Sequence, residues 1–368
     1  MKNQVMINVT KTDLPSLKEY NYYLKKIWKT HWLTNNGQLL QDFEKELKKY
    51  LKVKYIIPVT NGTLAIQVAI KALDLKGEII TTPYTFAAST TAIIWENCIP
   101  VFADIDTNTY NIDPIDIEKK ITKKTSAILA VHVYGNPCSV EELEKIAKKH
   151  HLKIIYDAAH AFGVEYKNKS ILDFGDISTL SFHATKTFHT IEGGAIVTDD
   201  KKIFEKIKLL INFGIKSEEE IILPGINAKM NEFQAAMGLC NLKKINERIK
   251  KRKAIYQHYL ESLKDTNIQF QKITASKFNY TYMPIILKNS KTRDLLFDTL
   301  VKQNIKPRKY FYPLITDFDY YKKQDLNKKF NLINSKYISD RILCLPIYSS
   351  LKISIVNRII KIIKKNSI

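Results

Sequence analysis

The sequence contains few cysteines, and these lie far apart. Cys98, Cys138, Cys240 and Cys344 form no CxxC pair in the 368 residues, and no histidines stand at the spacing of a zinc finger. Disulfide frameworks and structural zinc sites both depend on such clusters. We therefore predict neither a disulfide scaffold nor a metal site, and we expect the reduced thiols that are typical of a cytoplasmic protein.

Long apolar runs are also missing. No stretch approaches the roughly 18 consecutive apolar residues that read as a membrane-spanning helix. Residues 1–5 (MKNQV) do not open an apolar signal segment. The sequence therefore predicts a protein that neither spans a membrane nor is exported.

Acidic residues are scarce relative to basic ones. The chain has 37 Asp and Glu against 58 Lys and Arg, which gives a formal net charge of +21. Such an excess suggests a basic nucleic-acid-binding protein as one alternative, and the amphipathic stretch around Ile355, Ile359 and Ile362 fits that alternative. The lysines are spread along the whole chain, however, so we predict no nucleic-acid partner. We expect the C-terminal stretch to be a packing helix, and the charge to steer an anionic substrate.

Short apolar runs alternate with helical patterns between about residues 55 and 210. This alternation is typical of parallel strands joined by crossover helices, and it predicts an α/β fold. The helix near residue 140 is predicted to begin with a capping box between Ser139 and Glu142. Strands are predicted at residues 55–59, 77–81, 101–104, 127–133, 153–157, 177–182 and 194–197, with a helix at 63–73.

The pattern of the sequence changes after residue 240. A long charged helix is predicted over residues 241–263, followed by shorter mixed segments. We therefore expect a large domain of residues 1–240 and a smaller domain of residues 241–368. The chain has no internal repeat and no Pro-rich or Gly/Ser-rich linker, so the two domains are expected to pack together.

Three groups of polar residues follow predicted strands, where ligands of α/β sheets bind. Residues 60–63 (TNGT) place a glycine turn at the start of a helix, whose free amides suit a phosphate; the alternative is an ordinary turn. Asp157 ends an apolar strand, where its carboxylate could pair with a protonated pyridine nitrogen or cap a helix. Lys186 lies on the loop after another strand, five residues beyond Ser181, and could form an imine with an aldehyde.

These three groups together predict a site for pyridoxal 5′-phosphate (PLP). They supply a phosphate cradle, a partner for the pyridine nitrogen and an imine-forming lysine. Phe86 lies between the first two groups and is the candidate to stack on the ring, although it could equally be a core residue at a helix start.

With these residues in place, the sequence resembles the nucleotide-sugar aminotransferases of the DegT/StrS type, a branch of fold type I. That fold has a large domain with a mixed, mostly parallel sheet and a smaller C-terminal α/β domain. The resembling segments span nearly the whole chain: residues 32–34 (WLT), 61–63 (NGT), 83–86 (PYTF), 132–135 (HVYG), 157–160 (DAAH), 181–186 (SFHATK), 192–194 (EGG), 227–238 (NAKMNEFQAAMG), 308–313 (RKYFYP) and 345–348 (LPIY).

The resemblance implies roles for individual residues. Lys186 would bind the cofactor covalently and then move the proton, and Asp157 would pair with the pyridine nitrogen. Phosphate would be bound by Ser181 together with Gly62 and Thr63. The remaining implied roles are stacking by Phe86, contact of His160 with the 3-hydroxyl group, and contact of Asn227 with the phosphate of a partner subunit's cofactor, which implies a homodimer with shared active sites.

The sugar nucleotide would lie near His183, Arg308 and Tyr310, because a cation and phenols suit a pyrophosphate. An Arg beside tyrosines can also be a surface ion-pair cluster.

The resemblance also implies an activity. The amino donor would be glutamate, and the acceptor would be dTDP-4-keto-6-deoxy-D-glucose, which gives dTDP-4-amino-4,6-dideoxy-D-glucose. Such an amino sugar belongs to O-antigen or other surface glycan biosynthesis. An aminotransferase for a 3-keto sugar is one alternative. A PLP-dependent sugar dehydratase is another, but in that branch a histidine replaces the lysine found here as Lys186.

Overall fold

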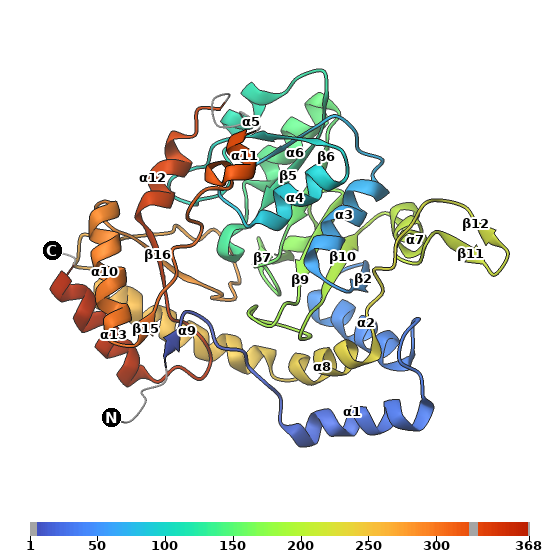
Figure 1. The fold of residues 1–368 in the computed structure, drawn as a ribbon, viewed down its shortest axis with the longest axis horizontal. Coiled ribbons are helices and arrows are strands. Elements are labelled where there is room, and N and C mark those ends of the chain that lie inside the picture. Colours follow the sequence, from blue (N-terminus) through green and yellow to red (C-terminus); the bar gives the residue numbers. More distant parts are fainter. Residues whose placement is uncertain (1–5, 324–329, 367–368) are drawn as a thin grey trace.

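A computed structural model of the protein describes residues 6–323 and 330–366 (Figure 1). The predicted character of residues 1–5 therefore lies outside the described residues. The helices are α1 (Leu17–Thr30), α2 (Gln38–Leu51), α3 (Gly62–Ala72), α4 (Ala87–Trp95), α5 (Pro114–Lys120), α6 (Val140–His150), α7 (Lys201–Leu210), α8 (Glu232–Leu242), α9 (Ile245–Leu263), α10 (Ser290–Lys302), α11 (Asp319–Lys323), α12 (Ile333–Arg341) and α13 (Ile353–Asn366).

A seven-stranded sheet forms the centre of the molecule, in the order β2-β10-β9-β6-β5-β3-β4. β10 runs antiparallel to both of its neighbours, and the other adjacent pairs are parallel, so the predicted mixed, mostly parallel sheet is confirmed. The strands are β2 (Tyr55–Val59), β3 (Glu78–Thr81), β4 (Ile99–Phe102), β5 (Thr125–Val131), β6 (Lys153–Asp157), β9 (Ile177–Ser181) and β10 (Gly194–Thr198).

Both faces of this sheet are covered, which explains why its strands are apolar at successive positions. Ile56 and Ile154 belong to one hydrophobic cluster, with residues of α2 and α6. Their neighbours Ile57 and Ile155 belong to a second cluster, with residues of α3, α4 and α7. Burial on both faces leaves the ends of the strands as the place where polar groups meet.

Smaller sheets complete the fold. A three-stranded sheet lies in the C-terminal part of the chain, where α13 packs against α9 and α10, as the packing-helix interpretation predicted. The strand pair β1–β15 joins residues from both sides of position 240, whereas the hairpin β11–β12 projects from the body (Figure 1). These strands are β1 (Ile7–Asn8), β7 (Glu165–Tyr166), β8 (Lys169–Ser170), β11 (Ile215–Ser217), β12 (Glu220–Ile221), β13 (Gln269–Phe270), β14 (Met283–Ile286), β15 (Ile305–Lys306) and β16 (Ile342–Leu345).

Two local predictions were wrong. Ser139 does precede α6, but its side chain accepts no hydrogen bond; its carbonyl oxygen accepts from the Glu142 amide instead, so there is no capping box. The predicted helix over residues 241–263 is interrupted at Lys243 and Lys244, between α8 and α9. Asn241, near the end of α8, is buried and bonded to His189 and Arg248, and these contacts lie outside any local sequence pattern.

No helix in the described residues has the length and apolarity needed to cross a membrane.

Candidate active site

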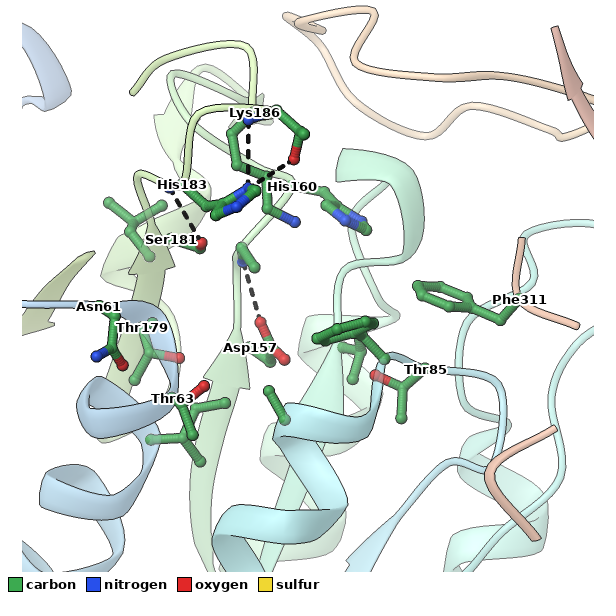
Figure 2. Close-up of a pocket in the computed structure, with 18 of the residues that line it drawn as sticks. Asn61, Thr63, Thr85, Asp157, His160, Thr179, Ser181, His183, Lys186 and Phe311 are labelled. Atoms are coloured by element: carbon green, nitrogen blue, oxygen red, sulfur yellow. Dashed lines mark hydrogen bonds between the residues drawn. The ribbon is translucent and has the colours of Figure 1, made fainter. Parts of the chain in front are cut away.

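A cavity of about 310 Å³ opens where the central strands end, which is large enough for a small cofactor. Its lining includes all the predicted site residues except Asn227. Figure 2 shows Asp157 between Asn61 and Thr63 on one side and Thr85 and Phe311 on the other, with Lys186 on a loop above. These residues come from positions 61 to 311, so the fold gathers them.

The helix α3 forms one wall of the cavity. Its N-cap residue Asn61 accepts a hydrogen bond from the Leu64 amide, whereas the helix offers no acceptor to the amides of Gly62 and Thr63. A Cβ atom on Gly62 would lie 2.9 Å from the Ser181 Cβ atom, so only glycine lets the helix approach β9 this closely. The two free amides and the Ser181 hydroxyl group therefore form a cradle suited to a phosphate.

The loop after β9 carries Lys186, and its base is fixed by aromatic packing. Phe182 and Phe188 are buried and pack edge to face, with ring centroids 5.1 Å apart. The Phe182 amide donates to the Gly193 carbonyl oxygen, and the Lys186 amide closes a turn onto the His183 carbonyl oxygen. The half-buried Lys186 side chain therefore leaves a fixed turn and reaches into the cavity (Figure 2).

Burial also changes the charge of Lys186. Loss of water around the ammonium group lowers its pKa from 10.5 to about 8; the nearby Asp157 opposes this shift, and Arg308 adds to it. A substantial fraction of the amine is therefore neutral near pH 8, and the neutral amine is the form that attacks an aldehyde.

Asp157 ends β6 at the floor of the cavity. Its side chain is 6% exposed and accepts hydrogen bonds from the Ser89 hydroxyl group and the Ala159 amide. The following residues form turns, so the helix-cap alternative is wrong. Within the described residues, no Lys, Arg or His lies within ion-pair distance of this carboxylate. A buried carboxylate without an ionic partner suits a protonated ring nitrogen.

Two aromatic side chains, those of Phe86 and His160, line the same cavity as Asp157. Phe86 is 54% exposed although it is large and apolar, so the core-residue alternative is wrong. His160 is buried, and its Nδ1 atom finds no hydrogen-bond partner in the described residues. Burial and the charges of Lys186 and Arg308 hold the pKa of His160 well below its ordinary value, so the ring is neutral and can serve as a hydrogen-bond partner.

The predicted sugar-nucleotide residues all line the cavity, and Tyr310 is buried there. Arg308 is exposed, and its guanidinium carbon lies 3.8 Å from the ring centroid of Tyr310, which is a cation–π contact. No acidic group among the described residues pairs with Arg308, so the surface ion-pair alternative is wrong. His183 lies 2.8 Å from the Thr185 hydroxyl oxygen and 3.5 Å from a Glu192 carboxylate oxygen.

Asn227 is exposed and does not line the cavity of its own chain. Its predicted contact with a partner subunit's cofactor stays a prediction.

The sequence interpretation missed Thr85, Ser89, Tyr282 and Phe311. Thr85 and Ser89 are four residues apart around the start of α4, a spacing that could have signalled a side-chain contact. Phe311 follows the predicted Tyr310 in the segment 308–313, whereas no local signal marks Tyr282.

The residues fit each part of PLP. The amides and hydroxyl groups at the start of α3 suit its phosphate, the unpaired Asp157 suits its ring nitrogen, and the exposed Phe86 suits its ring face. Lys186 supplies an amine for its aldehyde, and the orphaned His160 nitrogen suits its hydroxyl group. In the described residues, no cluster of His, Cys, Asp and Glu could hold a metal ion.

Comparisons with known proteins agree with this geometry. The family model of the DegT/DnrJ/EryC1/StrS aminotransferases matches residues 16–364. The chain is 44% identical to the dTDP-4-amino-4,6-dideoxy-D-glucose transaminase of Escherichia coli, covering 98% of this chain and 99% of that protein. It is 34% identical to the dTDP-3-amino-3,6-dideoxy-alpha-D-galactopyranose transaminase of Aneurinibacillus thermoaerophilus, covering 78% and 80%.

A solved structure is also similar. DesI, crystallised in the presence of its TDP-sugar product, superposes with a TM-score of 0.92 at 30% identity, covering 98% of this chain and 93% of DesI. The predicted fold of type I PLP-dependent transferases is therefore confirmed. The chain belongs to the DegT/DnrJ/EryC1/StrS aminotransferase family.

Proposed function

We propose that this enzyme transfers the amino group of glutamate to the 4-keto group of dTDP-4-keto-6-deoxy-D-glucose, giving dTDP-4-amino-4,6-dideoxy-D-glucose. The observation that carries the proposal is the 44% identity, over nearly the full length of both chains, to a transaminase of that name. The lower identity to the transaminase named for a 3-amino sugar makes amination at carbon 3 the alternative. Lys186 occupies the position at which the dehydratase branch has histidine, which speaks against dehydration.

The cofactor is PLP. When bound, it supplies an aldehyde for amine exchange and a ring that withdraws electrons from the neighbouring carbon. We propose that the amides of Gly62 and Thr63 and the Ser181 hydroxyl group bind its phosphate and thereby fix its orientation, and that Phe86 covers one face of its ring. Asp157 would hold a proton on the ring nitrogen by presenting an ionised carboxylate to it.

Lys186 would have two tasks. Its neutral Nζ atom would hold the cofactor covalently through the aldehyde group. When it is free, Nζ would accept a proton and return it to a neighbouring atom. The pKa of about 8 suits both tasks, because Nζ is neither fully protonated nor fully neutral near that pH. Arg308 and His183, which line the cavity, would orient the anionic sugar nucleotide.

We also propose that the enzyme is a cytoplasmic homodimer with shared active sites. The four cysteines are free and buried, which agrees with a reducing compartment. Ile221 and Ile222 are exposed on the projecting hairpin β11–β12, and Asn227 lies just beyond it, outside the cavity of its own chain. Exposed apolar side chains on a projecting element are typical of a protein interface.

The proposal is tested with purified enzyme, PLP, glutamate and two sugar nucleotides that carry the keto group at carbon 4 or at carbon 3. We expect glutamate to change the absorption of the bound cofactor and the 4-keto sugar to restore it, with the amino sugar as product. Lys186→Ala should abolish turnover, and Lys153→Ala is the matched control because that lysine is on the protein surface, in an ion pair with Asp176. Amination of the 3-keto sugar alone would contradict the proposed substrate.

A further inference from the structure

The Asp157 carboxylate is held at both oxygen atoms. Its Oδ2 atom accepts a hydrogen bond of 2.7 Å from the Ser89 hydroxyl group, and its Oδ1 atom accepts one of 3.0 Å from the Ala159 amide. Ser89 lies on α4 and is fully buried, so water does not compete for this bond. The orientation of the carboxylate is therefore set by groups of the protein.

A second hydroxyl group stands behind the first. The Thr85 hydroxyl oxygen lies 2.9 Å from the Ser89 hydroxyl oxygen, and Thr85 is 3% exposed. Each hydroxyl group has one proton to donate, and an ionised carboxylate can only accept. Ser89 must therefore donate to Asp157 and accept from Thr85, so the direction of both bonds follows from the charge on Asp157.

We propose that Thr85 and Ser89 form a hydroxyl relay that positions the Asp157 carboxylate toward the ring nitrogen of the cofactor. This inference rests on the proposed pairing of Asp157 with the ring nitrogen. Hydrogen bonds to both oxygen atoms hold the carboxylate in one orientation at the cavity. A carboxylate held toward the ring nitrogen stabilises the proton there, and that proton increases the electron withdrawal that transamination needs. Ser89 acts through Asp157 and is a positioning residue.

A merely structural role for the Ser89 hydroxyl group would look different. Ser178, on β9, is also fully buried, and its hydroxyl group has no hydrogen-bond partner in the described residues. Ser178→Ala removes the same atom from an equally buried site without touching Asp157, so it is the matched control. An effect that is specific to Ser89→Ala then arises from its hydrogen bonds to Asp157 and Thr85, and not from the loss of a buried hydroxyl group as such.

The test uses the whole enzyme loaded with PLP that carries ¹⁵N in its ring, without substrate. The nitrogen resonance reports whether the ring nitrogen is protonated. Ser89→Ala is expected to move the resonance toward the unprotonated position and to weaken PLP binding about tenfold, the usual size for a lost hydrogen bond to a charged group. Ser178→Ala should leave both unchanged.

Thr85 provides a second, independent variant. Thr85→Val removes the donor behind Ser89 and should move the resonance in the same direction by a smaller amount, whereas Thr85→Ser keeps the hydroxyl group and should match the wild type. If Ser89→Ala fails to fold, the two Thr85 variants still test the relay. An unchanged resonance in both Ser89→Ala and Thr85→Val overturns the relay.

Asp157→Asn tests the pairing of Asp157 with the ring nitrogen, on which the relay depends. A resonance that moves in Asp157→Asn but not in Ser89→Ala means that Asp157 pairs with the ring and that the relay is wrong. A resonance that stays in Asp157→Asn overturns the pairing and, with it, the relay. Because no sugar nucleotide is present, neither result depends on which substrate the enzyme uses.

Discussion

Lys186 shows how a residue acquires reactivity from its surroundings. The sequence contains many lysines, and most of those described here are exposed. Lys186 differs because it enters a cavity from which much of the water is excluded, next to a second cation at Arg308. Both influences disfavour the charged form, and the attraction of Asp157 only partly offsets them.

This environment predicts how covalent capture of PLP by the cofactor-free enzyme depends on pH. The neutral amine reacts, so the capture rate should rise with pH and level off above about pH 8, where an ordinary lysine would still be protonated. Arg308→Met removes a positive charge, raises the pKa of Lys186 and should move the midpoint to higher pH. Stopped-flow absorption measures the rate, with Lys186→Ala as the blank. A midpoint that stays in place or moves to lower pH in Arg308→Met would contradict this account.

The start of α3 shows how an element positions a site. In the central sheet, β10 lies between β2 and β9. Although α3 follows β2 in the chain, its first residue contacts Ser181 at the end of β9, on the other side of β10. A Cβ atom on Gly194 would lie 2.7 Å from the Asn61 backbone, and one on Gly62 would lie 2.9 Å from Ser181. Two glycines therefore permit the close approach on which the proposed phosphate cradle depends.

Gly62→Ala is expected to push α3 away from Ser181 and to weaken PLP binding about 10- to 100-fold, the range that overpacking of one methyl group gives. Pyridoxal, which lacks the phosphate, should bind the variant and the wild type equally. Equilibrium titration of the cofactor-free protein with both compounds measures the difference. An equal loss for both compounds would mean that the substitution disturbs the ring site rather than the cradle.

At the scale of the whole molecule, the proposed shared active sites predict complementation between two inactive variants. In a mixed dimer of Lys186→Ala and Asn227→Ala chains, one site would combine the wild-type Lys186 of one chain with the wild-type Asn227 of the other. We therefore expect mixed dimers, isolated with two different affinity tags, to regain activity that neither parent dimer has. Mixed dimers with no more activity than the parents would show that Asn227 does not serve the neighbouring site.

The N-terminal segment also connects distant parts of the molecule. Strand β1 pairs with β15, and Thr12 then donates a hydrogen bond to the Ala184 carbonyl oxygen on the loop that carries Lys186. The next residue, Asp13, contacts His189 on the same loop and Ser349 in the C-terminal part. Residue 240 lies inside α8, so the domain boundary there stays a prediction. The N-terminal segment contacts residues on both sides of that position.

The sequence by itself determined the α/β class, the positions of the central strands and most of the predicted site residues that line the cavity. Those features are local: an apolar run long enough to cross a buried sheet marks a strand, and Asp157 and Lys186 stand beyond such strands. Residues 60–63 likewise predict the start of a helix. Periodicity and turn chemistry depend on neighbours in the chain, so one sequence displays them.

Only the tertiary structure decided how these parts meet. The Ser89 contact with Asp157 joins residues 68 positions apart, and Tyr282 and Phe311 reach the cavity from the C-terminal part. The missing capping box at Ser139 and the break before α9 likewise depend on backbone geometry and on contacts with distant residues. Such contacts arise from the order of strands in the sheet, which fixes spatial neighbours without leaving a periodic pattern in the sequence.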